Sequence, residues 1–242
     1  MNSEFSFYQF VQTIDSGCDY CDLSIPVCFG SDIAFFTDQS ITEVAYCAQS
    51  GDLIKVAENV VYGTGNKYAK LSDDLTKILA LGDCFRLRIN DTYFSNTLRY
   101  VEYEADIALL EYRCNEAQFG FDYDVTTQMN KVRLPLRLFN PKFPQDEKVY
   151  VTSTGQRKVQ YAKIDKEWEL ETEYLPESIH EKIIIALSHD KLVINDEEVT
   201  KSAEYDIDWA EYINLDTDCT GKLAKAKCKV QQNRTLRNSN CR

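Results

Sequence analysis

The chain has 242 residues, of which 44% are hydrophobic, and its 39 acidic against 27 basic side chains give a formal net charge of −12 at pH 7. A chain of this length and hydrophobicity buries its own core as one large domain or two small ones, which excludes wholesale disorder. The acidity also excludes a surface that grips nucleic acid broadly, because phosphate contacts require a basic face.

The first half of the chain predicts a short arm followed by a β-sandwich. Residues 1–17 are predicted as an N-terminal arm, because their aromatic side chains have no local strand to pack on. Residues 18–115 are typical of an immunoglobulin- or fibronectin-like β-sandwich, with short strands separated by turn residues. The clearest strand is 84–89, where apolar and polar side chains alternate. Ser72-Asp73-Asp74 predicts the start of a helical turn.

The second half predicts a smaller α+β domain over residues 116–213. Pro135, Pro141 and Pro144 punctuate the stretch after Tyr123, and the boundary is placed near Glu116. A β-hairpin is expected over 149–164, turning at Thr154-Gly155. A helix of about three turns is expected at 177–188, because Pro176 suits a helix start and apolar residues follow at a spacing of four. The predicted fold class is therefore mainly β.

Residues 167–174 are predicted to form a strand with alternating side chains. Its inward side chains are Trp168, Leu170, Thr172 and Tyr174, and its four outward glutamates are Glu167, Glu169, Glu171 and Glu173. Neighbouring outward carboxylates on a strand lie about 6.7 Å apart, which is near the separation of the paired carboxylates of some glycosidases. Glycosidase pairs sit on different elements across a cleft, however, and this sequence supplies no opposite wall. The stripe is therefore interpreted as the solvated face of a half-buried strand, with a hydrolase as the competing hypothesis.

The histidines and cysteines do not form a catalytic or metal-binding pattern. His180 and His189, nine residues apart on the predicted helix, face opposite sides and cannot share a metal ion. Nine cysteines without an export signal favour reduced thiols. Four of them could hold zinc, but after the first C-x2-C pair the gaps are irregular, which favours buried apolar roles. Those four are Cys18, Cys21, Cys28 and Cys47. We predict no catalytic residue, cofactor or metal, and no membrane-spanning segment.

Residues 214–242 are predicted as a basic C-terminal arm. The last 22 residues contain seven bases and no acid, a charge of +7, while the preceding 220 contain 20 bases and all 39 acids, a charge of −19. A basic end on an acidic body favours docking onto another copy or an acidic partner, with nucleic acid or a solvated tail as alternatives. The predicted partner-contact residues are Lys222, Lys225, Lys227, Lys229, Arg234, Arg237 and Arg242.

Four stretches resemble structural tail proteins of tailed phages that infect Bacteroidota, including the crAss-like group. They are Cys21-Asp-Leu-Ser-Ile-Pro-Val27 with Asp32-Ile-Ala-Phe-Phe, Gly82-Asp-Cys-Phe-Arg-Leu-Arg-Ile89 with Tyr93-Phe-Ser-Asn96, Arg133-Leu-Pro-Leu136 with Glu147-Lys-Val-Tyr150, and Lys166 to Tyr174 with His180 to Asp190. Together they span about residues 20–210, and each is mainly a pattern of strand and turn residues.

This resemblance implies a non-enzymatic subunit of the virion tail (a ring, adaptor or tail-barrel component) that is assembled in the cytoplasm of the bacterial host. Its expected partners are copies of itself in a symmetric ring and neighbouring virion tail proteins. Genomic DNA would pass such a subunit without specific binding, because an acidic lining repels the polyanion. The competing hypothesis is a carbohydrate- or protein-binding β-sandwich adhesion module that uses exposed aromatic side chains.

Overall fold

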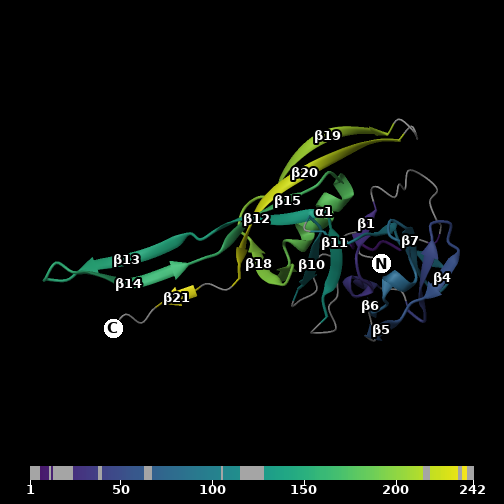
Figure 1. Cartoon of the computed structure of the whole chain (residues 1–242), viewed down its shortest axis with the longest axis horizontal. Helices are drawn as coiled ribbons and strands as arrows, with labels where there is room; N and C mark the ends of the chain where they lie inside the picture. The colour runs from purple at the N-terminus through teal and green to yellow at the C-terminus, as the bar shows by residue number, and fades with distance from the viewer. Residues whose placement is uncertain are drawn as a thin grey trace.

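The computed structural model is mainly β and describes residues 6–10, 12, 24–37, 40–62, 67–104, 106–114, 128–214, 219–233 and 236–238. Within those ranges the strands form two large sheets and a separate three-stranded sheet, accompanied by one α-helix and short 3-10 turns (Figure 1). The mainly β class predicted from Tyr-, Val- and Thr-rich segments is confirmed.

The smaller of the two large sheets has the order β1-β9-β7-β3-β4, with β8 paired to β7. The β1 strand pairs with β9 in parallel, and the remaining pairs are antiparallel. These strands are β1 (Ile25–Val27), β3 (Val44–Ala48), β4 (Leu53–Val56), β7 (Cys84–Ile89), β8 (Tyr93–Phe94) and β9 (Leu98–Tyr100). The predicted alternation of β7 is confirmed, since Phe85, Leu87 and Ile89 are fully buried.

The larger sheet has the order β12-β15-β20-β18-β17-β10-β11-β2-β6-β5, with β16 and β19 also paired to β20. Its strands from the first half of the chain are β2 (Ala34–Thr37), β5 (Asn59–Tyr62), β6 (Lys67–Leu71) and β10 (Ala108–Arg113). Those from the second half are β11 (Asn130–Leu134), β12 (Leu136–Lys142), β15 (Glu167–Thr172), β16 (Leu175–Pro176), β17 (Lys191–Ile194), β18 (Glu197–Lys201), β19 (Asp206–Asn214) and β20 (Cys219–Gln232).

The predicted division into two domains near residue 116 is wrong, because strands from both halves share this sheet. The β10 strand pairs with both β11 and β17, and β11 continues to β2 through Lys131 and Ala34. One hydrophobic cluster runs from Phe35 and Tyr46 in the first half to Ile183 and Val230 in the second. Shared strand pairing and a continuous core join the strands of the two large sheets into one structural unit.

The aromatic side chains of the predicted N-terminal arm belong to this core where the structure describes them. Phe7, Tyr8 and Phe10 are buried, and the Tyr8 and Phe10 rings lie 5.5 and 4.9 Å from the Phe35 ring. The Tyr8 hydroxyl donates a hydrogen bond of 3.0 Å to the carbonyl oxygen of Lys131. The prediction of an arm is therefore wrong for residues 6–10. Burying these aromatic rings against β2 removes their apolar surface from water, which stabilises the packed position over an exposed one.

The predicted helix forms as α1 (Glu177–Ala186), and it packs against β16 and β20. Pro176 occupies the N-cap position, and Ile179, Ile183 and the following Leu187 are buried. The spacing of four therefore places the apolar side chains on the face that meets the sheet, as predicted.

Two long hairpins extend from this body (Figure 1). One consists of β13 (Gln145–Val151) and β14 (Arg157–Ile164), and β21 (Leu236–Asn238) pairs with β14 to complete the three-stranded sheet. Its turn contains Gly155 at φ +79°, as expected from the Thr154-Gly155 signal. The other hairpin is formed by β19 and β20, which pair along the whole of β19.

The description of residues 214–242 as an arm is wrong for residues 219–232, which form β20. This 14-residue strand pairs with β15, β16, β18 and β19, and Ala224, Ala226, Cys228 and Val230 on it are buried. Alternate small and apolar side chains face the core, while the lysines between them face the other side of the sheet.

Candidate functional site

Three of the predicted partner-contact lysines lie on β20 opposite the glutamate stripe of β15. Lys225 forms an ion pair of 2.8 Å with Glu173, and Lys227 forms one of 3.1 Å with Glu171. Lys229 is the direct cross-strand neighbour of Glu169. The acidic stripe and the basic strand, interpreted separately from the sequence, are therefore brought together within one chain.

The β12 strand supplies further bases on the opposite side of the stripe. Arg137 bonds Glu171 at 2.8 Å, and Lys142 bonds Glu169 at 2.6 Å. Hydrogen bonds from Arg137 and Lys227 lower the pKa of Glu171, and those from Lys142 and Asn140 lower the pKa of Glu169. A glycosidase acid needs a raised pKa, so these two carboxylates are unsuited to that role.

The remaining predicted partner-contact residues cannot be placed in the same way. The side chains of Lys222 and Arg237 lie outside the described part of the structure, although their backbones belong to β20 and β21. Arg234 and Arg242 lie outside the described residues altogether. Their role as partner contacts stays a prediction.

A shallow hollow of about 260 Å³ lies beside the ladder of ion pairs. It is lined by Glu169, Ala203, Glu204, Lys227, Cys228 and Lys229. Burial raises the pKa of the Cys228 thiol, so the sulfur is held in the unreactive protonated form. The Cys228 thiol in this hollow is therefore not an activated nucleophile, and the Glu169 carboxyl beside it has a lowered pKa.

His180 is a buried structural residue. Its Nε2 lies 2.9 Å from the carbonyl oxygen of Ala224, and its Nδ1 lies 2.7 Å from the Tyr205 hydroxyl. A carbonyl only accepts, so Nε2 carries the proton and Nδ1 accepts from Tyr205. Burial lowers the pKa of His180, which keeps the ring neutral. This histidine links α1 to β20 and is not free to act as a proton donor or metal ligand.

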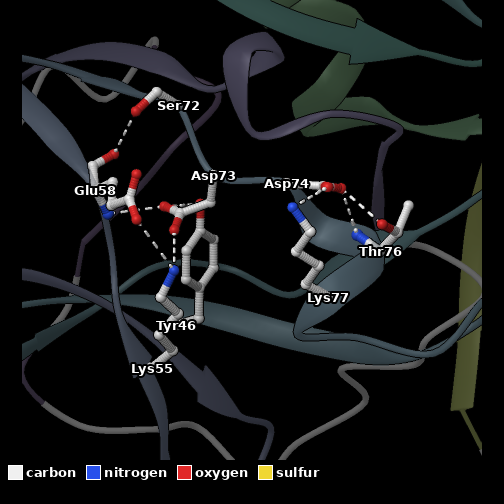
Figure 2. Close-up of polar contacts among 8 residues, drawn as sticks. All are labelled: Tyr46, Lys55, Glu58, Ser72, Asp73, Asp74, Thr76 and Lys77. Carbon is white, nitrogen blue, oxygen red and sulfur yellow. Dashed lines mark hydrogen bonds and ion pairs between the residues drawn. The ribbon is translucent and has the colours of Figure 1, made fainter.

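A buried carboxylate, Asp73, organises the loop at one end of the smaller sheet. Figure 2 shows Tyr46 and Lys55 reaching it from β3 and β4, at 3.1 and 2.6 Å, and the Glu58 amide donates to it at 2.8 Å. A Cβ on Gly30 would lie 2.5 Å from the Asp73 carbonyl oxygen, so only glycine fits there.

The next residue, Asp74, begins the 3-10 turn η3 (Leu75–Lys77), where the sequence predicted a helical turn. Its side chain accepts hydrogen bonds from the Thr76 amide and hydroxyl and forms an ion pair of 3.1 Å with Lys77 (Figure 2). The Thr76 hydrogen bonds, followed by that from Lys77, lower the pKa of Asp74. Both aspartates therefore serve the fold rather than a ligand.

A buried ion pair joins the 3-10 turn η2 (Gly30–Asp32) to β11 of the larger sheet. The Arg133 Nε on β11 lies 2.5 Å from the Oδ2 of Asp32, which belongs to η2 and also accepts from the Phe29 amide. The Arg133 guanidinium lies over the rings of Phe29 and Tyr103, at 5.9 and 5.2 Å from their centroids. Because its charge is paired with Asp32 and its guanidinium packs on two aromatic rings, Arg133 has a structural role.

The cysteines in the described part of the chain are of two kinds, buried thiols and the disulfide-bonded Cys84. The thiols of Cys28, Cys47, Cys114 and Cys228 form no disulfide and are all buried, and burial raises the pKa of each. Cys84 is disulfide-bonded, so the prediction that all cysteines are reduced is wrong for this residue. Cys18 and Cys21 of the alternative zinc hypothesis lie outside the described residues, and within the described part no three metal-ligating side chains cluster.

A buried lysine on α1 gives a prediction for stability. Lys182 is 5% exposed, and burial lowers its pKa from the ordinary 10.5 to about 8. The folded state then binds fewer protons than the unfolded chain between these values, so stability contributed by this group rises with pH from about 8 to about 10.5. Below pH 8 the cost of the buried ammonium is fully present, about 3 kcal/mol at 1.36 kcal/mol per pKa unit.

We therefore expect Lys182→Met to raise the free energy of unfolding by about 1–3 kcal/mol at pH 7, with the gain shrinking towards pH 10.5. Urea unfolding of wild type and variant at pH 7 and pH 10 measures this difference. Lys191→Met, at an exposed lysine on β17, is the matched control and should change stability little at either pH. An increase in the free energy of unfolding that is the same at pH 7 and pH 10 would contradict the lowered pKa of Lys182.

The feature that stands apart from the body is the β13–β14 hairpin, here called the hairpin arm. Every residue of β13 is exposed, including Val149 (49%), Tyr150 (45%) and Val151 (61%). Consecutive strand residues point to opposite faces, so both faces of β13 present apolar side chains to solvent. The unbroken apolar run Val149-Tyr150-Val151 is the sequence pattern that indicates this exposure on both faces. A hairpin with one buried face would instead alternate polar and apolar residues.

Comparisons with known proteins return nothing for this chain: no protein-family model matches, nor does any curated protein or solved structure. Among the described residues, none of the helical segments has the length and apolarity needed to cross a membrane. The hairpin arm, which projects from the body and exposes apolar side chains on both faces of β13, is the candidate functional site.

Proposed function

We propose that the protein is a non-enzymatic structural subunit of a bacteriophage tail that assembles with copies of itself and with neighbouring virion proteins. The observation that carries this proposal is the hairpin arm, which reaches away from the body and exposes Val149, Tyr150 and Val151 on its outermost strand (Figure 1). Exposed contiguous apolar side chains on a projecting element are typical of assembly surfaces. The resemblance of residues 20–210 to phage tail proteins is the reason for proposing a virion tail as the assembly.

Charge supports the same proposal. The net charge is −12, and Lys225 and Lys227 of β20 form ion pairs with Glu173 and Glu171 of the same chain. An acidic subunit lining a tail would let genomic DNA pass without specific binding. The two sheets that share the core in the first half support a β-sandwich, and we propose an immunoglobulin-like relationship for it.

Immunogold labelling tests the tail assignment. Antibodies raised against the recombinant chain should decorate the tails of virions that contain it, seen by electron microscopy. Labelling of the cell envelope instead, together with retention of the chain on immobilised glycans, would favour an adhesion module and contradict the proposal. Pre-absorbing the antibodies with recombinant chain is the control, since it should abolish labelling at either place.

A further inference from the structure

The end of the hairpin arm combines apolar and basic side chains. Residues 148–158, its distal half, contain three bases and no acid: Lys148, Arg157 and Lys158. In the β13–β14 register Tyr150 lies opposite Lys158, and Val151 lies opposite Arg157. The distal half thus carries +3, while the rest of the chain carries −15, because the whole carries −12.

A surface of complementary character lies at the other end of the molecule, on β4. This strand is the last of its sheet, and Leu53 (53%), Ile54 (40%) and Val56 (46%) are exposed on it. Asp52 and Glu58 flank these apolar side chains and are themselves exposed. We call the five residues the β4 patch.

The lysine of β4 neutralises only part of the acidic charge at this patch. The Lys55 Nζ lies 2.6 Å from the buried Asp73 and 3.6 Å from the exposed Glu58 (Figure 2), so one cation is shared between two carboxylates and Asp52 adds a third. The hydrogen bond to Asp73 is the main cause of the raised pKa of Lys55. A strand at the edge of a sheet with exposed apolar side chains tends to pair with another chain, unless a charged side chain or a β-bulge prevents the pairing. The extra residue in the β3–β4 register, Ile54, is such a bulge, so contacts through side chains are favoured over a long backbone ladder.

We propose that the distal half of the hairpin arm of one copy docks on the β4 patch of a second copy. This inference rests on the proposed function and names the partner surface for its self-assembly. The apolar run Val149-Tyr150-Val151 would cover Leu53, Ile54 and Val56, while Arg157 and Lys158 face Asp52 and Glu58. The two surfaces lie at opposite ends of an elongated molecule (Figure 1). A contact between different surfaces of identical chains propagates, and it closes into a ring if the rotation permits.

A charge exchange tests this contact without relying on disruption alone. One double variant, Arg157→Glu with Lys158→Glu, sets an acidic arm against the acidic patch, and another, Asp52→Lys with Glu58→Lys, sets a basic patch against the basic arm. Each variant alone should associate about tenfold or more weakly than wild type, measured as mass against concentration by analytical ultracentrifugation. An equimolar mixture should recover association, because each arm then meets a patch of opposite sign on the other variant.

Lys191→Glu, a charge reversal at an exposed lysine on β17, is the control and should associate as wild type does. Association that is unchanged in both double variants would overturn the proposed contact while leaving self-assembly, and with it the proposed function, intact. A wild-type chain that stays monomeric at every concentration would also overturn the proposed contact. The immunogold labelling of virions tests the proposed function independently of that result. Loss of association in both variants without recovery in the mixture would equally refute the pairing of these two surfaces.

Discussion

Deleting residues 219–242 is expected to leave no folded protein. The deletion removes β20, an interior strand of the larger sheet that pairs with β15, β16, β18 and β19. It also removes the buried Val230 and Cys228 from the core and the cationic partners of Glu171 and Glu173. A domain of this size has only about 5–15 kcal/mol of net stability, which the loss of a central strand exceeds.

Circular dichroism and thermal unfolding of the purified truncation measure this outcome, and we expect no cooperative transition. The matched control ends at Asn233, which keeps β20 whole and removes only the β21 strand from the described structure. The control should melt cooperatively, because β21 pairs with β14 of the hairpin arm and not with the larger sheet. A 219–242 deletion that melts like the control would contradict the central place of β20.

Asp32→Ala should destabilise the fold by about 3–5 kcal/mol, because it leaves the buried guanidinium of Arg133 without its counter-ion. Arg133 is 6% exposed, and its Nη1 has no hydrogen-bond partner even in the intact pair. The double variant Asp32→Ala with Arg133→Met should cost less than Asp32→Ala alone, since it removes the buried charge together with its partner. Urea unfolding of the two single variants, the double variant and wild type gives the coupling energy.

Arg137→Ala provides the contrast at an exposed ion pair. Arg137 lies 2.8 Å from Glu171, but its side chain is 45% exposed, so the loss should be at most about 1 kcal/mol. If Asp32→Ala cost no more than Arg137→Ala, or if the double variant were less stable than both single variants, the buried pair would not have the role assigned to it.

The ion pairs between the glutamates after and within β15 and the lysines of β20 reduce the basic charge that β20 could offer to a partner. A basic arm free to dock would make association depend on residues 222–229, but Lys225 and Lys227 already have partners in their own sheet. Surface pairs of this kind contribute little each, yet they hold three adjacent strands in register by matching charge across β12, β15 and β20. At the end of the hairpin arm, by contrast, residues 148–158 contain three bases and no acid.

Local patterns in the sequence determined the class and several elements of this protein. Apolar alternation determined the strands β7 and β15, where Trp168, Leu170 and Thr172 are buried. Apolar spacing determined α1, and Asn195-Asp196 determined the turn between β17 and β18, where both residues have positive φ. Tyr174 departs from the predicted inward face and is 52% exposed, because β15 ends at Thr172. Such patterns act over a few residues, so they can be interpreted without knowing the fold.

The alternation of β20 was also present in the sequence but was misinterpreted. Lys225, Lys227 and Lys229 alternate with Ala224, Ala226, Cys228 and Val230, and these four side chains are buried. Two alanines carry too little apolar surface to indicate a core strand on their own, and the charge of the lysines suggested a solvated tail instead. The glutamates that neutralise them lie about 50 residues earlier in the sequence.

Only the tertiary structure decided which strands became neighbours. The pairing of β11 with β2 joins Lys131 to Ala34, nearly 100 residues away, and that pairing merged two predicted domains into one sheet. It also left β4 and β13 as terminal strands with exposed apolar side chains. Strand pairing satisfies backbone hydrogen bonds that every residue carries, so side-chain patterns specify which face is buried but not which strand lies alongside.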